Sequence, residues 1–409
     1  MPTHDAYAAL RLSAFRRYTS GNLLYVLGLR MQKVAIGWEI YERTGSALHL
    51  GYVGLVQFLP IAIFAIFAGQ VTDSYNRKKV LMVALAFTAL AAFGLAWNSH
   101  TLGSVAAMYA CLVITGIAFA FIHPARASLV PRIVPRELLN NAVSWNSSGF
   151  ELASMFGPAA GGLLIAFFSS PKLVYVLNGV AALAFLVLLA RVRYEHQETE
   201  RTPVTLRSLS AGLRFVWKTK EVMAAMMLDM FAVLLGGATS LMPIFAKDIL
   251  HVGPRGLGWL MTAPAIGAFS MSMIQAHRLP FRRAGRALLL TVSGFGVVTI
   301  LFGLSTTFWF SLLMLFLLGA FDNVSVVVRL TLVQLRTPDE MRGRVSALST
   351  LFIGTSNELG SFESGIVAGL FGPVFSVVSG GIGTLVVVAC ITLLAPQLRR
   401  YGSLDASRL

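Results

Sequence analysis

Long runs of apolar residues that are nearly free of charge recur along the chain, and they limit its fold more than any other feature. Crossing the roughly 30 Å of hydrocarbon in a bilayer takes about 20 mostly apolar residues in a helix. Lipid offers no partner for unpaired backbone groups, so each such segment must be helical. The sequence therefore predicts an all-α integral membrane protein with twelve transmembrane helices, over residues 16–43, 48–70, 80–98, 104–125, 140–168, 172–190, 221–245, 256–277, 287–305, 308–328, 345–371 and 374–395.

The composition favours a membrane protein and argues against a soluble one. Only 12% of the 409 residues are charged and 56% are hydrophobic, whereas a soluble protein carries about 25% charged residues. The N-terminal residues contain no short apolar core followed by a small-residue cleavage site, so we expect no removable signal peptide. Cys111 and Cys390 lie in separate apolar runs, which is not the pattern of a disulfide framework or of a metal site.

The distribution of lysine and arginine predicts the orientation of the helices. The formal net charge is +15, and 27 of the 33 basic residues fall on one side if both termini lie inside. Arg126 and Arg329 are counted among them, as loop residues that follow the fourth and tenth spans. Because cytoplasmic loops carry an excess of positive charge, both termini are predicted to be cytoplasmic, with the protein in the inner (cytoplasmic) membrane. The same asymmetry explains the net charge without a nucleic-acid partner.

The two halves of the chain repeat one another. With a shift of 203 positions, Gly116 matches Gly319 and Arg126 matches Arg329 on one gap-free diagonal. Duplicated six-helix halves are typical of secondary transporters, whose binding site lies near the bilayer midplane between the halves. The predicted domains are an N-terminal six-helix bundle, a cytoplasmic linker with an amphipathic helix, and a C-terminal six-helix bundle, over residues 1–192, 193–220 and 221–409.

A short polar loop with the sequence "GQVTDSYNRKK" separates the second and third spans. Gly69 predicts a tight helix contact, Asp73 lies where a carboxylate favours a helix N-terminus, and Arg77 and Lys78 suit the headgroup region. The loop resembles the signature between the second and third helices of the major facilitator superfamily, with Ser74 where a basic residue is usual. The resemblance implies that these residues act in an ionic latch that closes the cytoplasmic side. The matching turn of the second half, "QAHRLPFRRAGR", has no acid.

A run of small residues, "GPAAGG", lies in the fifth span. Gly157, Gly161 and Gly162 let helices approach closely, and Pro158 supplies a point of bending. Packing alone would explain the run, but it also resembles the fifth-helix signature of superfamily exporters that work as antiporters, with Ala153 in place of one glycine. Two further stretches, "MQKVAIGWEIYERTGSALHLGYVGLVQFLP" and "TPDEMRGRVSAL", resemble the exporter branch that includes the enterobactin exporter and macrolide-efflux-like proteins.

Three polar residues lie in the middle of the first span. An ionisable side chain at the bilayer centre costs at least about 2.5–3.5 kcal/mol, so each one needs a reason. We interpret Arg30 as facing a central cavity, where it either binds an anionic part of the substrate or holds a carboxylate, and a structural ion pair between helices is the alternative. Gln32 and Lys33 follow it as candidate binding residues. Glu39, near the outer end of the span, is expected to reach water.

Acidic residues in other spans are candidates for coupling transport to protons. Glu151, Asp229 and Asp322 lie within the fifth, seventh and tenth spans. A carboxyl group placed there can bind a proton and release it in turn, which a proton-coupled carrier requires. For each of them, pairing with a base at a helix end is the alternative. The fourth span lacks the arginine that many drug/proton antiporters of the superfamily carry.

These patterns together predict a secondary active transporter that works by alternating access. The resemblance favours a proton-coupled exporter of small amphipathic organic compounds, drug-like or siderophore-like. An uptake carrier, a lipid or lysophospholipid translocator, and a transport-dead membrane sensor are the alternatives. No nucleophile with its base and no cluster of metal ligands is visible, so we expect neither an enzyme nor a metal or other cofactor. The expected partners are a small-molecule substrate, the proton and the lipid bilayer, and the expected state is a monomer.

Overall fold

The structure is a computed structural model of the chain, and it describes residues 5–193, 213–236, 238–277 and 283–402. It describes the backbone of Asp73 but not its side chain. Most of the predicted linker, including the first part of its amphipathic helix, lies outside the described residues. The described residues contain helices and turns and no strand.

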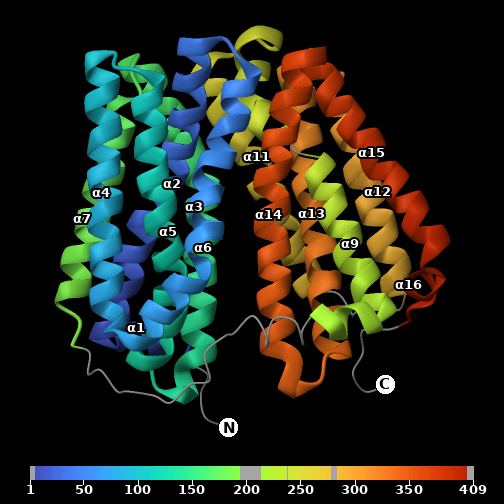
Figure 1. Cartoon of the computed structure of the whole chain (residues 1–409), viewed down its shortest axis with the longest axis horizontal. Coiled ribbons are helices and arrows are strands. Elements are labelled where there is room, and N and C mark those ends of the chain that lie inside the picture. The colour runs from blue at the N-terminus through green and yellow to red at the C-terminus, as the bar shows by residue number, and fades with distance from the viewer. Residues whose placement is uncertain (1–4, 194–212, 237, 278–282, 403–409) are drawn as a thin grey trace. The chain divides into compact units, whose positions relative to one another are not determined.

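The helices divide into two compact units, one formed by Met1–Arg43 with Val56–Pro203 and the other by Thr44–Leu55 with Val204–Leu409. The first unit begins with the short helix α1 (Ala8–Arg11). Its long helices are α2 (Ser13–Thr44), α3 (Ala47–Ser74), α4 (Arg77–Thr101), α5 (Val105–Ile133), α6 (Leu139–Phe168) and α7 (Lys172–Ala190), with a 3-10 turn at Arg136–Leu138 (Figure 1). The first turns of α3 group with the second unit.

The second unit contains the helices of the C-terminal half. They are α9 (Lys220–Leu235), α10 (Met242–Ile244), α11 (Gly253–Ala276), α12 (Ala284–Gly303), α13 (Phe308–Arg336), α14 (Asp339–Phe371), α15 (Pro373–Leu394) and α16 (Pro396–Arg400). In this unit α13 packs against both α11 and α12, and α9 packs against α14 and α15. In the first unit α4 packs between α5 and α7.

Eleven of the twelve predicted spans each correspond to one long helix and the seventh to an interrupted one, which confirms the all-α membrane architecture. Ten of the described helical segments are long and apolar enough to cross a membrane. The other two, α2 and α14, contain more charged residues, and α2 carries Arg30 and Lys33 within its middle turns. These two least apolar spans are therefore candidates for a functional site, because a buried charge in a membrane helix needs a function or a partner.

The seventh span is not one continuous helix. Helix α9 ends at Leu235, and the chain continues through a 3-10 turn at Ala238–Leu241, the single turn α10, and a π-helical segment at Phe245–Ile249. Pro243 lies in the first turn of α10, where its missing N–H is tolerated. Interrupted membrane helices are typical of transporters, because irregular backbone is tolerated where protein surrounds it or where it lines a cavity.

Each unit has its own apolar core, and large apolar side chains also cover its outside. The core of the first unit includes Tyr25, Leu85 and Phe185, and that of the second includes Leu228, Leu288 and Val328. Large side chains that remain exposed include Phe167, Leu290, Trp309, Leu393 and Leu394. Contiguous exposed apolar surface of this kind is unfavourable in water and suits contact with lipid tails.

Candidate functional site

A buried ion pair joins α9 to α13 in the second unit. Arg329 Nη1 lies 3.1 Å from Asp229 Oδ2, and the two side chains are only 3% and 8% exposed. The prediction that Arg329 is a loop residue is wrong, because α13 continues to Arg336 and encloses it. The helix extends beyond the apolar run of its sequence because Asp229 pairs with Arg329, the first basic residue after that run.

Asp322 adds a second carboxyl group to this pair. It lies in the middle of α13, seven residues before Arg329, so the two side chains share one face of the helix. Asp322 and Asp229 both line a pocket within the second unit, together with Ser325 and Phe295. The two acids are close enough to interact electrostatically with each other and with Arg329.

The cluster therefore contains two acids and one base in a low-dielectric environment. If all three groups were ionised, one negative charge would have no compensating partner, and burying an unpaired charge is strongly unfavourable. Binding one proton makes the cluster neutral, and releasing it makes the cluster negative. Because both carboxyl groups line the pocket, a proton can bind or leave there without dismantling the helix packing around it.

The first unit has the matching arginine but not the acids. Arg126, the counterpart of Arg329 in the internal repeat, lies within α5 beside the ring hydroxyl groups of Tyr18 and Tyr25 on α2. The prediction that Arg126 is a loop residue is therefore also wrong. The described neighbours of this arginine on α2 are therefore tyrosine hydroxyl groups and not carboxyl groups. The two halves share the base, and among the described side chains it is the second unit that combines it with carboxyl groups.

Arg30 lies in the middle of α2, with its guanidinium group over the ring of Phe150 on α6. The distance from Arg30 Cζ to the ring centroid is 4.7 Å. Glu151, the next residue on α6, is near enough to interact electrostatically with Arg30. The structure thus brings Arg30 and Glu151 of the predicted set together in the first unit, separately from the cluster of Asp229 and Asp322.

The other two polar residues of the first span point elsewhere. Gln32 is buried, and its Oε1 accepts a hydrogen bond of 2.7 Å from Asn178 Nδ2 on α7. That bond links two helices of the first unit, which is a common way for polar groups to join membrane helices. Lys33 is exposed. Roles for Gln32 and Lys33 in binding stay predictions.

The small residues of "GPAAGG" are packed directly against α2. A Cβ atom at Gly157 would lie 2.4 Å from Arg30 Cβ, and one at Gly161 would lie 2.9 Å from the carbonyl oxygen of Met31. Pro158 and Gly162 are buried. The glycines are therefore required for the close approach of α6 to α2, directly at the level of Arg30. Their part in a conformational change stays a prediction.

The first turn of α4 contacts the end of α7. Lys78 Nζ donates hydrogen bonds to the carbonyl oxygens of Ala190 (2.8 Å) and Val192 (2.7 Å), and Arg17 donates one to the carbonyl of Arg191 (2.6 Å). Two cations thus satisfy the last carbonyl groups of α7, where positive charge also favours the helix dipole.

The other candidate residues of the "GQVTDSYNRKK" stretch differ in their burial and contacts. Arg77 is 2% exposed, at the start of α4. The tight helix contact predicted at Gly69 is not found, because a Cβ atom there would meet no heavy atom within 4 Å. The side chain of Asp73 is outside the described part of the chain. The latch implied for these residues stays a prediction.

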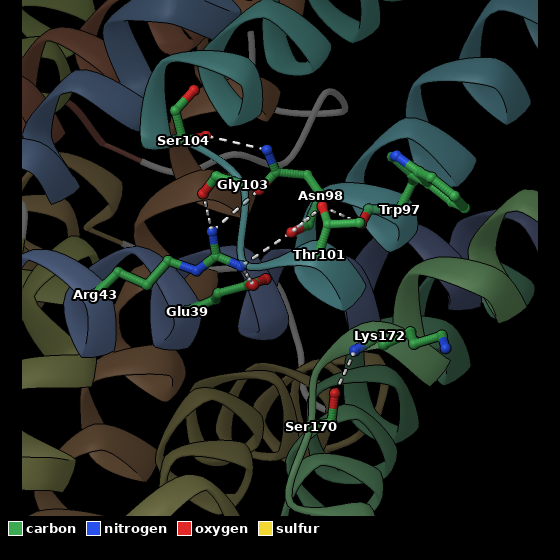
Figure 2. Close-up of polar contacts among 9 residues, drawn as sticks. All are labelled: Glu39, Arg43, Trp97, Asn98, Thr101, Gly103, Ser104, Ser170 and Lys172. Carbon is green, nitrogen blue, oxygen red and sulfur yellow. Dashed lines mark hydrogen bonds and ion pairs between the residues drawn. The ribbon is translucent and has the colours of Figure 1, made fainter.

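Glu39 does not reach water, contrary to the prediction, because it is 3% exposed. Figure 2 shows it paired with Arg43, one turn further along α2, and Arg43 also bonds the turn between α4 and α5. Arg43 Nη1 donates to Asn98 Oδ1 (3.1 Å) and to the carbonyl oxygen of Gly103 (2.7 Å). Asn98 Nδ2 in turn donates to the carbonyl oxygen of Ser104. This network ties the end of α2 to that turn.

Comparison with known proteins shows the family. Residues 4–408 match the family model described as "Transmembrane secretion effector". The chain belongs to this family. It is 26% identical over 404 residues to proteins named enterobactin exporter EntS from Shigella boydii and from Escherichia coli, with 98% of this chain and 94% of each relative covered.

Solved structures show the same fold at lower sequence identity. A bacterial homologue of the human lysosomal transporter Spinster, in an inward-facing and occupied conformation, superposes with a TM-score of 0.77 at 15% identity, covering 97% of this chain and 99% of that one. A D-xylose–proton symporter superposes with a TM-score of 0.70 at 14% identity, covering 95% and 99%. The fold is that of the major facilitator superfamily, and the protein is a multi-pass membrane transporter with a small-molecule substrate.

Two groups of residues in this transporter were missed by sequence reasoning. Arg329 was assigned to a loop by its position after an apolar run, although its distance of seven residues from Asp322 offered a usable signal. The spacing of Glu39 and Arg43, four residues apart on one helix, was a usable signal for their pair, whereas the bonds of Arg43 and Asn98 to the carbonyl groups of Gly103 and Ser104 gave none. The pattern that would have identified Arg329 is a basic residue on the same helix face as an acidic residue in a membrane span.

Proposed function

We propose that this transporter exports small amphipathic organic compounds in exchange for protons. The family description as a secretion effector and the exporter relatives support the outward direction. The close packing of "GPAAGG" on α2 supports it as well, because the small residues that resemble the antiporter signature lie where the helices meet, although Ala153 replaces one of its glycines. The reaction makes or breaks no covalent bond in the substrate.

The observation that carries the proposed proton coupling is the cluster of Asp229, Asp322 and Arg329. It places two carboxyl groups at one pocket in the second unit, with a guanidinium group paired to one of them. With one proton bound the cluster is neutral, and without it the cluster has one uncompensated negative charge. A transporter that changes conformation easily in only one of these states, and binds substrate best in the other, exchanges protons for substrate.

We further propose that the protein works as a monomer in the inner (cytoplasmic) membrane with both termini in the cytoplasm. The distribution of basic residues supports this orientation. It places the N-terminal ends of α2 and α4, and the contacts of Lys78 with the end of α7, on the cytoplasmic side.

Inverted membrane vesicles test the proposal, because exported compounds are then pumped inward. Vesicles from cells that produce the protein would be energised to acidify their interior, and an acridine dye would report the pH difference. Enterobactin, taken from the name of the relatives, and a series of amphipathic dyes are the probes. We expect at least one probe to accumulate inside, to dissipate the pH difference, and to stop accumulating once an ionophore collapses it.

Vesicles without the protein provide the background. Glu42→Gln, which removes an exposed carboxyl group of α2, provides a matched control and should transport normally. Accumulation that continues at the same rate after the pH difference has collapsed would refute proton coupling. Movement of the probes only out of the inverted vesicles would refute export.

A further inference from the structure

We infer that Arg30 and Phe150 form an anion-binding site in the first unit, and that the transported compound is an organic acid with an aromatic or similarly apolar body. The inference rests on the proposed function, because it names the class of compound that such an exporter would carry. It does not depend on proton coupling, and the experiment below separates the two.

The first observation is that the charge of Arg30 has no hydrogen-bonded partner. A guanidinium group has five N–H donors, yet within the described residues Arg30 takes part in no hydrogen bond and no ion pair. Its side chain is half-buried near the middle of a 32-residue helix. Since an ionised group at membrane depth costs at least about 2.5–3.5 kcal/mol, an unused set of donors there favours a ligand that supplies the acceptors.

The second observation is the position of Phe150. With Arg30 Cζ 4.7 Å from the ring centroid, the aromatic face stabilises the cation without using the N–H groups at the guanidinium edge. A planar edge of parallel donors matches the two oxygens of a carboxylate, or two oxygens of a sulfonate or phosphate. Phe150 is 45% exposed, so the same site offers an apolar ring beside the cation.

The third observation is that the base of the Arg30 side chain is held rigidly. The missing side chain of Gly157 leaves room for Arg30 Cβ, which lies 2.4 Å from the position a Cβ atom would take. The "GPAAGG" run therefore positions the cation as well as packing two helices. A group held in place before binding loses less conformational entropy when the ligand arrives, which increases affinity.

Glu151 is the nearest alternative partner, and it does not neutralise Arg30. It interacts electrostatically with Arg30, but no ion pair within 4.0 Å joins the two among the described residues. An acid beside the site lowers its affinity for an anion and would favour an organic cation instead. The choice between the two ligand classes can therefore be tested by removing each charge in turn.

Equilibrium binding to the purified full-length protein in lipid nanodiscs tests the inference without any gradient. The probes share one ring system and differ in charge: 2-naphthoate, 2-naphthalenemethanol and 2-naphthylmethylammonium. We expect 2-naphthoate to bind about tenfold more tightly than the neutral probe, as one charge-assisted bond pair would provide. Arg30→Gln should abolish this preference, Arg30→Lys should keep part of it, and Glu151→Gln should strengthen 2-naphthoate binding by roughly threefold.

Lys172→Gln is the matched control, since it removes a base at the start of α7, and it should leave the preference unchanged. Elution of each variant as a single species in size-exclusion chromatography establishes that it is folded. Any one of four results would overturn the inference. These are equal binding of the anionic and neutral probes, no saturable binding of 2-naphthoate, tighter binding of the ammonium probe, and an unchanged preference in Arg30→Gln. None of these results would bear on whether transport is coupled to protons.

Discussion

At the scale of single residues, the most consequential contact is the ion pair between Asp229 and Arg329. Each side chain is less than a tenth exposed, so neither charge is screened by water. Removing Arg329 leaves both carboxyl groups of the cluster without a base, and removing Asp229 takes away the carboxylate nearest to Arg329. The pair therefore makes each residue depend on the other for stability.

We expect Asp229→Asn to lower the free energy of unfolding by about 1–3 kcal/mol, because buried Arg329 loses the carboxylate that lies 3.1 Å from it, while Asp322 still compensates part of its charge. Asp229→Leu and Asp322→Leu combined with Arg329→Met, which removes every charge of the cluster, should recover most of that loss. Glu221→Gln is the matched control: Glu221 and Arg336 also join α9 to α13, at 3.6 Å, but are 23% and 40% exposed. It should cost about 0–1 kcal/mol. Thermal unfolding in detergent measures all three, and equal losses for Asp229→Asn and Glu221→Gln would contradict the account.

The charged residues within the spans were predictable from the sequence, but their partners were not. Asp229, Asp322 and Arg30 were identified as candidates because charge within an apolar run is costly wherever it lies. The partner of each residue depends on how helices that are far apart in the sequence pack against one another. The periodicity of the sequence does not predict this packing. Glu39 illustrates the limit, because it was expected in water and instead pairs with Arg43 against the turn between α4 and α5.

At the scale of helices, the close contact of α6 with α2 depends on Gly157. We expect Gly157→Val to push the helices apart and to destabilise the protein by about 1–3 kcal/mol, the usual cost of overpacking. Gly149→Ala is the matched control on the same pair of helices, because its Cβ atom would lie 3.7 Å from Leu23, an ordinary contact. Thermal unfolding compares them. A Gly157→Val protein as stable as Gly149→Ala would show that the contact is not tight.

The end of α7 depends on Lys78 in a similar way. Lys78→Gln removes the ammonium group that binds the carbonyl oxygens of Ala190 and Val192. We expect this change to weaken the last turn of α7 by about 1 kcal/mol, which corresponds to roughly fivefold faster hydrogen exchange of its amides. Lys79→Gln, at an exposed position, should leave the exchange unchanged. Equal exchange in the two variants would contradict a clamping role.

The helices themselves were predictable from hydropathy, and their irregularities were not. An apolar run reports that a segment lies in lipid, so all twelve spans were found. It does not report by itself where a helix breaks, and the predicted seventh span ran through the interruption after Leu235, although the residues "GGATS" and Pro243 that follow it in the sequence are signals of a break. Helix ends were also misjudged at α5 and α13, because each helix continues past its first basic residue.

At the scale of the whole molecule, the two halves repeat the same order of helices but differ in chemistry. The first unit carries Arg30 with Phe150, the "GPAAGG" run and the loop that contains Lys78. The second unit carries the acids beside Arg329, where the first has the tyrosines beside Arg126. A repeat of this kind preserves packing while each half acquires its own polar groups. On the proposed function, the second unit handles the proton and the first binds the substrate.

The central claim is that the carboxyl groups in the second unit carry the proton, and the direct test is transport by Asp322→Asn in proteoliposomes. The probe is whichever compound the vesicle assay identifies for the unaltered protein. The account predicts that the variant still exchanges labelled for unlabelled probe across the membrane, because the neutral amide side chain mimics the protonated carboxyl group of Asp322. It should no longer accumulate the probe against a gradient when a pH difference is applied. Accumulation to the same ratio as the unaltered protein would contradict the claim.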